Sequence, residues 1–134
     1  MFDPLALAGK HGILMQCAPL RASGGCTDGQ RVWLDEHLTD LEARCALTHE
    51  IVNISRGYDR HQLAAMDDLV RAQTAWLLVP PEAITKHVGS QLDEWHLAQE
   101  LGVTERMLVD RLHFASAVEL QALREAGVLG WVAC

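Results

Sequence analysis

Residues 38–57 read LTDLEARCALTHEIVNISRG, and this stretch decides the fold of the chain. Thr39 and Glu42 have the spacing of a capping box, in which the threonine hydroxyl accepts from the backbone three residues on while the glutamate reaches back. Apolar residues then recur at helical spacing on two adjacent stripes as far as Gly57. The pattern predicts a largely buried helix over Asp40–Arg56.

Within this predicted helix the segment beginning at His49 reads HExxN, with Glu50 second and Asn53 last. Residues i and i+4 share one helical face, so two imidazoles there can bind one zinc ion while the intervening glutamate acts as general base. His49 and Asn53 have the ligand positions, and Glu50 has the position of the base. Zinc prefers imidazole, thiolate or carboxylate to an amide oxygen. Asn53 therefore predicts a weakened metal site.

The arrangement resembles the ImmA/IrrE family of small bacterial and phage metallo-endopeptidases, and the likeness covers nearly the whole chain. The family pattern has a strand that carries an aliphatic residue and an aspartate, which matches Leu34-Asp35. The helix that follows in the family reads L-T-x-x-E-x-R-C-x-L-x-H-E-x-x-H-x-x-x-G, which matches residues 38–57 except at Asn53. The resemblance implies a zincin-like core.

The next helix of the family supplies a carboxylate ligand thirteen residues before a proline that closes the helix. Counting back from Pro80 places Asp67 at that position. Aspartate is one methylene shorter than the family's glutamate, so the two helices must lie slightly closer together. The resemblance thus implies zinc as cofactor, Glu50 as the catalytic residue, and a ligand set of His49, Asn53 and Asp67.

Two other side chains could compensate for Asn53. His61 is the nearest substitute ligand in the sequence, and Cys45 lies one turn before His49 on the same predicted helix. The spacing of Cys45 fits the apolar stripe of that helix, which favours a packing role for its side chain.

The remainder of the chain predicts an α+β fold. Residues 3–12 predict a short helix with Asp3 as N-cap and a proline at its first position. Ile13–Cys17 and Arg31–Leu34 read as strands, and Gly24-Gly25 reads as a hairpin loop between them. We expect a small antiparallel sheet packed on the helical core.

The second half of the chain predicts helices only. Arg60–Leu78 reads as a long helix that Pro80-Pro81 stops. We expect a peptidase core over residues 1–80 and a helical subdomain over 81–134 that resembles a helix-turn-helix. The helices expected in this subdomain are Pro81–Val88, Leu92–Leu101, Thr104–Phe114 and Ser116–Ala126, the last with a capping box at Ser116 and Glu119.

Composition narrows the possible partners and locations. The 134 residues carry 11 basic and 18 acidic side chains, a net charge of −7, and residues 91–134 share this acidic character. Acidic surfaces repel phosphates, which argues against direct nucleic-acid binding. The apolar runs are too short to cross a bilayer, and the first residues lack the pattern of a secretory signal. We expect a cytoplasmic protein with free thiols. The family resemblance implies a bacterial cell as its location and a phage as one source.

Two functions of different class follow from these residues. The first is a zinc metallo-endopeptidase that cleaves a cytoplasmic regulator such as a phage or mobile-element repressor, as the resemblance implies. The second is a catalytically degenerate relative that binds a repressor or host protein without proteolysis. Asn53 favours the second function, whereas the retention of Glu50 and Asp67 favours the first.

Overall fold

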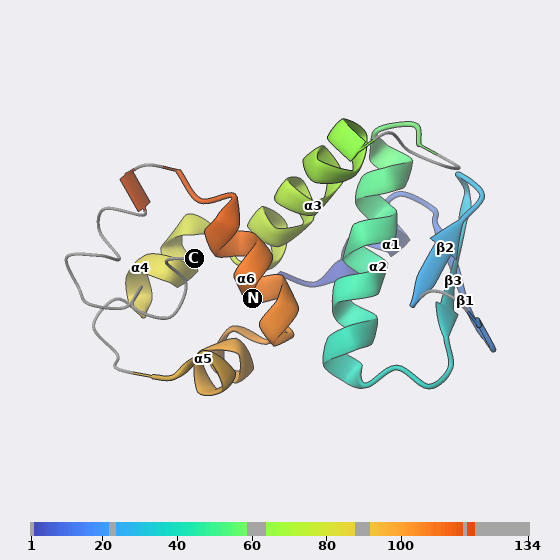
Figure 1. Ribbon diagram of the computed structural model, residues 1–134. Helices are drawn as coiled ribbons and strands as arrows, with labels where there is room; N and C mark the ends of the chain where they lie inside the picture. Colours follow the sequence, from blue (N-terminus) through green and yellow to red (C-terminus); the bar gives the residue numbers. More distant parts are fainter. Residues whose placement is uncertain (1, 22–23, 59–63, 88–91, 117, 120–134) are drawn as a thin grey trace.

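The computed structural model describes residues 2–21, 24–58, 64–87, 92–116 and 118–119. It is an α+β structure in which a three-stranded sheet packs on one side of a long helix and the later helices lie on its far side, while the first helix packs against both the sheet and the long helix (Figure 1). No helix in these residues is long and apolar enough to cross a membrane.

The first helix, α1, spans Pro4–Lys10 and begins as the sequence predicts. The Asp3 carboxylate accepts hydrogen bonds from the backbone of Leu5 and Ala6, at 3.0 and 3.2 Å. These bonds satisfy two amides that have no partner within the helix. Gly12 follows with φ of +67°, a conformation that glycine adopts without steric cost.

The sheet is mixed, so the prediction of an antiparallel sheet is wrong for one of its two strand pairs. Strands β1 (Leu14–Ala18), β2 (Gly25–Thr27) and β3 (Arg31–Asp35) lie in the order β1-β3-β2. β2 and β3 form an antiparallel hairpin, but β1 pairs with β3 in parallel. Gly25 is therefore the first residue of a strand and not only part of a loop.

The mixed sheet follows from the burial of β3. Its side chains Val32 and Leu34 are 0 and 3% exposed, and they pack among residues of α1 and α2. Placing this strand in the centre pairs its backbone on both sides, which a buried strand requires. The parallel partner is distant in sequence, so the local pattern of each strand does not reveal it.

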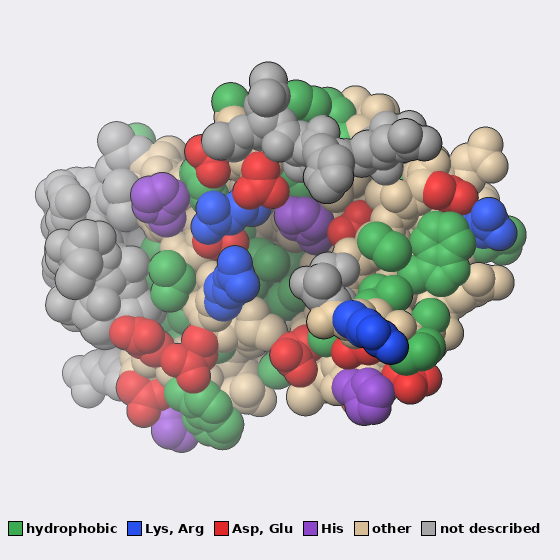
Figure 2. All heavy atoms as spheres, turned by 45° about the vertical axis from the view of Figure 1, so that its right-hand side comes forward, with side chains coloured by type: hydrophobic (Ala, Val, Ile, Leu, Met, Phe, Trp, Pro, Cys, Tyr) green, Lys and Arg blue, Asp and Glu red, His purple; other side chains and the backbone are tan. Residues whose placement is uncertain are grey.

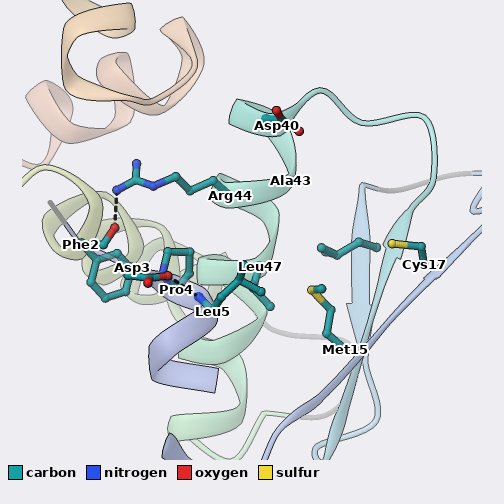
Figure 3. Close-up of a pocket in the computed structure, with 11 residues that line it drawn as sticks. Phe2, Asp3, Pro4, Leu5, Met15, Cys17, Asp40, Ala43, Arg44 and Leu47 are labelled. Carbon is teal, nitrogen blue, oxygen red and sulfur yellow. Dashed lines mark hydrogen bonds between the residues drawn. The ribbon is translucent and has the colours of Figure 1, made fainter. Parts of the chain in front are cut away.

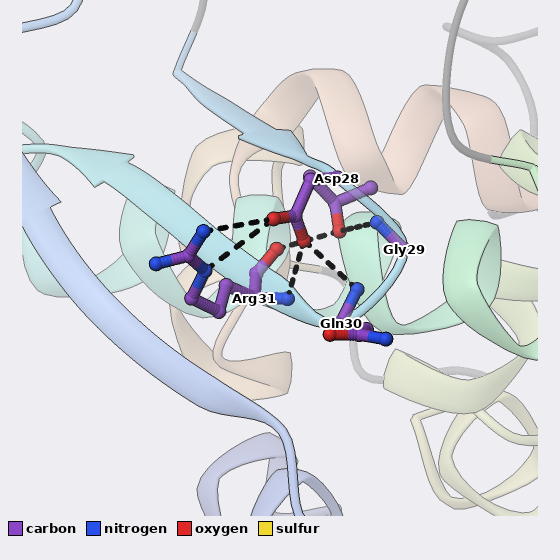
Figure 4. Close-up of polar contacts among 5 residues, drawn as sticks. Asp28, Gly29, Gln30 and Arg31 are labelled. Atoms are coloured by element: carbon purple, nitrogen blue, oxygen red, sulfur yellow. Dashed lines mark hydrogen bonds and ion pairs between the residues drawn. The ribbon is translucent and has the colours of Figure 1, made fainter.

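The β2–β3 turn is held by one carboxylate and one hydroxyl (Figure 4). Asp28 accepts from the backbone of Gln30 and Arg31 and from the guanidinium of Arg31. Thr27 donates its hydroxyl to the Arg31 carbonyl at 2.6 Å and accepts from the backbone of Gly29. Gly29 has φ of +96°, so this tight connection requires glycine there.

Helix α2 spans Asp40–Ser55 and confirms the predicted capping box. The backbone of Glu42 donates to the Thr39 hydroxyl at 3.2 Å, and the backbone of Thr39 donates to the Glu42 carboxylate at 3.0 Å. Seven residues of α2 are buried, which agrees with the predicted burial. The helix ends at Ser55 with Arg56 as its C-cap, and Gly57 follows with φ of +74°, which breaks the helical path.

The later helices also follow their predicted positions: α3 (Ala64–Leu78), α4 (Pro81–Lys86), α5 (Glu94–Leu101) and α6 (Glu105–His113). α5 begins two residues later than predicted, because Asp93 caps it through the backbone of His96. Three parts of the predicted helices lie outside the described residues. They are the start of the helix predicted over Arg60–Leu78, the end of the one predicted over Pro81–Val88, and most of Ser116–Ala126. The predicted capping contacts between Ser116 and Glu119 are present.

One buried cluster joins α2 and α3 to the helices of the second half. It combines Cys45 of α2 with Leu78 of α3, Leu101 of α5 and Leu108 of α6. Arg111 of α6, 2% exposed, adds a polar link by donating from Nε to the Val79 carbonyl at 2.6 Å. The predicted peptidase core and the predicted helical subdomain therefore share a common interior.

Truncating Leu108 tests this shared interior. Leu108 is completely buried, so Leu108→Ala is expected to lower the free energy of unfolding by about 2–5 kcal/mol. The neighbouring Val109 is 46% exposed, and Val109→Ala should change it by no more than about 0.5 kcal/mol. Urea denaturation of the two variants measures the difference. Equal effects would show that α6 does not pack as described.

Candidate functional site

A cleft of about 450 Å³ opens between α2, the start of β2, α3 and the N-terminal part of α6. Five residues of α2 line it at three- and four-residue spacing, so they form one face of that helix. These residues are Glu42, Cys45, Ala46, His49 and Glu50. Figure 2 shows a face of the molecule on which histidine, acidic and basic side chains surround a hollow.

Three of the predicted site residues line this cleft. His49 and Glu50 come from α2, and Asp67 faces them from the first turn of α3. α2 and α3 pack directly against each other, which brings residues eighteen positions apart to one cavity. An imidazole and two carboxylates thus line a single solvent-accessible space.

Asn53, the fourth predicted site residue, takes a different place. Its side chain is 6% exposed and is not among the residues that line the cleft. Its amide nitrogen Nδ2 donates to Glu50 Oε2 at 3.3 Å. The amide of Asn53 therefore contacts the predicted general base in the interior of the helix pair.

Glu50 is a buried carboxyl at the inner wall of the cleft, with 8% of its surface exposed. Burial raises the pKa of Glu50 above its ordinary value, while the nearby His49 and the hydrogen bond from Asn53 partly offset the rise. A raised pKa strengthens a carboxylate as a base, which suits it to accept a proton from water near neutral pH.

Gly25 is a site residue that the sequence reading missed. A Cβ atom at this position would lie 3.4 Å from Glu50 Cγ and 3.2 Å from Leu34 Cδ2. Such contacts are tighter than most, so glycine lets β2 approach the base closely. The Gly24-Gly25 pair is visible in the sequence, but only the packing of β2 on α2 shows that it lines the cleft.

The sequence also did not indicate that α6 forms one wall of the cleft. Arg71 of α3 donates from one terminal nitrogen to Asp110 Oδ1 at 2.6 Å and from Nε to Oδ2 at 3.4 Å. Asp110 raises the pKa of Arg71 through these bonds, and the guanidinium also lies 5.8 Å from the ring centroid of Phe114. Since Arg71 is one turn after Asp67, this contact fixes the part of α3 that presents Asp67.

Arg106 is the second cation of the cleft. It is exposed, and within the described part of the chain it forms no ion pair. Thr104 and Met107 line the cleft beside it, so the first turn of α6 forms the side opposite α2. The first turn of α6 thus lines the same cleft as His49 and Glu50.

The side chains of the cleft include types that bind zinc, but too few of those in the described part of the chain are grouped together to hold an ion. The nitrogen of His49 and the oxygens of Asp67 are ordinary zinc ligands. Among the residues that the structure describes, no three His, Cys, Asp or Glu side chains are grouped so that they could hold a metal ion. Asn53, 6% exposed and hydrogen-bonded to Glu50, is not placed among the residues that line the cleft, so it would have to rotate to become a third ligand.

The sequence suggests His61 and Cys45 as ligands in place of Asn53, and only Cys45 can be located in the structure. His61 lies outside the described residues. Cys45 lines the cleft but is 7% exposed and belongs to the buried apolar cluster, as its spacing indicates. Burial raises the pKa of the Cys45 thiol, which disfavours the thiolate that a metal would need.

No protein-family model matches the chain, and no curated protein or solved structure matches it either. The resemblance to the ImmA/IrrE peptidases therefore stays a prediction that rests on the sequence pattern.

Proposed function

We propose that the chain is a zinc-dependent metallo-endopeptidase whose substrate is a cytoplasmic regulator such as a phage or mobile-element repressor. The observation that supports the proposal is that His49, Glu50 and Asp67 all line one cleft. The three residues come from two helices, and their types match a metal ligand, a general base and a second ligand.

In this proposal His49 and Asp67 hold the ion, with Asn53 as a weak third ligand. A zinc ion bound there would polarise the peptide carbonyl and make water easier to deprotonate. Glu50 accepts the proton of the attacking water and then donates it to the leaving amine. The desolvation that raises the pKa of Glu50 serves both steps, because a carboxyl with a pKa nearer neutrality both gains and loses protons readily.

Arg71 and Asp110 have a positioning role in the same proposal. Their two hydrogen bonds join α3 to α6 across the cleft wall. Asp110 has 11% of its side chain exposed and Arg71 has 35%, so the contact is partly shielded from solvent. It anchors α3 to α6 at Arg71, one helical turn after Asp67.

A second function is favoured by the contact between Asn53 and Glu50. If the amide of Asn53 permanently occupies the glutamate, the chain retains the cleft but lacks both a ligand and a free base. Such a protein would bind a repressor or host protein through the cleft without cleaving it. This function predicts peptide binding that neither zinc nor a chelator changes.

A cleavage assay separates the two functions. Parent protein is incubated with a peptide mixture at micromolar free zinc, and the products are identified by mass spectrometry. We expect zinc-dependent cleavage that a chelator stops, that His49→Ala abolishes and that His11→Ala, at an exposed position outside the cleft, leaves intact. Peptides that stay whole with the parent and bind to it regardless of zinc would favour the binding protein.

A further inference from the structure

Strand β1 is an unprotected edge of the sheet. β3 pairs with one side of it, and no strand in the described part of the chain pairs with the other. Four of its five residues, Leu14 to Cys17, are exposed, including Leu14 at 64% and Met15 at 39%. An edge strand of this kind presents free backbone donors and acceptors to any extended segment.

The usual protections of an edge strand are missing here. Natural proteins place charges, prolines or bulges on exposed edges to prevent pairing. From Gly12 to Leu20 the chain has no charged residue, although 22% of all its residues are charged. Pro19 comes only after the strand has ended, so all five strand residues can still pair.

A groove of about 540 Å³ runs along this strand on the face toward α1 and α2. Figure 3 shows Met15 and Cys17 of β1 pointing into it, with Leu5 of α1 and Leu47 of α2 across from them. Leu5 is 59% exposed. The edge thus combines free backbone groups with uncovered apolar side chains.

We propose that β1 pairs in antiparallel fashion with β1 of a second copy of this chain, which joins two three-stranded sheets into one across a two-fold axis. The register is centred on Gln16, so that Gln16 faces its own copy. Met15 then lies opposite Cys17 of the second copy on the groove face, and Leu14 lies opposite Ala18 on the other face.

The strand is complementary to itself in this register. Apolar side chains meet apolar side chains on both faces, and the single polar residue, Gln16, meets an amide that can both donate and accept. No like charges face each other, which matters for two chains that each carry a net charge of −7. The same patch is used on both copies, as a two-fold interface requires.

This interface is separate from the cleft. The strand order is β1-β3-β2, and it is β2, at the opposite edge, whose first residue Gly25 lines the cleft. Pairing through β1 therefore leaves His49 and Glu50 accessible. The proposal does not depend on whether the protein cleaves peptides.

Sedimentation equilibrium of the full chain over a range of concentrations tests the proposal. We expect a dimer whose dissociation constant decreases when salt is added, because salt screens the repulsion between the two acidic chains. Gln16→Lys places two ammonium groups side by side on the two-fold axis and should weaken the dimer at least about tenfold. Gln99→Lys makes the same change at an exposed position of α5 and should leave the dimer unchanged.

Circular dichroism of both variants verifies that the exposed substitutions leave the fold intact. A parent chain that is monomeric at all concentrations would overturn the proposal. A dimer that Gln16→Lys leaves as tight as the Gln99→Lys control would overturn it as well, since the contact would then lie elsewhere.

Discussion

Asn53→His is expected to raise the affinity of the protein for zinc by about 10- to 100-fold. Metal affinity typically falls by this factor when a residue that hydrogen-bonds a metal ligand is removed. The substitution replaces a neutral amide by an imidazole one helical turn from His49, where two imidazoles can bind the same ion. It also removes the hydrogen bond from Asn53 to Glu50, which frees that carboxylate.

Competition with a chromophoric chelator measures this change directly on metal-free protein. Asn53→Ala is the matched control, because it removes the same hydrogen bond without adding a ligand. If the alanine variant gained as much affinity as the histidine variant, the effect would come from releasing Glu50 and not from the new imidazole. If neither variant gained, position 53 would not be a ligand position at all.

Glu50→Gln is expected to lower the rate of peptide cleavage by about 10²- to 10⁴-fold, the usual contribution of a general base. The amide keeps the size of the glutamate side chain but cannot take a proton from water. His49 and Asp67 are unchanged, so zinc binding should persist in this variant.

The same substitution should leave the stability equal or higher at neutral pH. The pKa of Glu50 is raised in the folded protein, so the ionised carboxylate destabilises the fold. This destabilisation is absent below the unfolded-state pKa, near about 4.3, and grows as the pH rises toward the folded-state value. Glutamine removes it, so the stability gain of the variant over the parent should increase with pH.

Thermal melts of parent and variant at several pH values, beside the cleavage assay, test both halves of this prediction. A Glu50→Gln protein that still cleaves peptides would show that another residue is the base. A variant less stable than the parent at neutral pH would show that the charge of Glu50 supports the fold.

Local signals in the sequence predicted the helices well. Asp3, and Thr39 with Glu42, each cap a helix at the predicted position, because capping depends on atoms within three residues. The parallel pairing of β1 with β3 could not be read in this way. It depends on which strand is buried by α1 and α2, and that contact joins distant parts of the chain.

The candidate site divides in the same way. His49 and Glu50 are visible as a motif on one helix, and the family resemblance implied Asp67 at a fixed distance before Pro80. The contribution of α6 could not, because Asp110 meets Arg71 across 39 residues. Helix α6 carries Arg106 and Arg111, and only the packing of α6 on α3 shows that Arg106 lines the cleft.

The central claim is that this cleft binds zinc. The most direct measurement is elemental mass spectrometry after equilibrium dialysis at micromolar free zinc, with protein purified without a metal-affinity tag. We expect about one zinc per chain in the parent and in Asn53→His, the stoichiometry of a mononuclear site, and a loss of zinc in His49→Ala. Zinc in Asn53→His but none in the parent would contradict the claim, because the cleft would then be a vestige of a metal site.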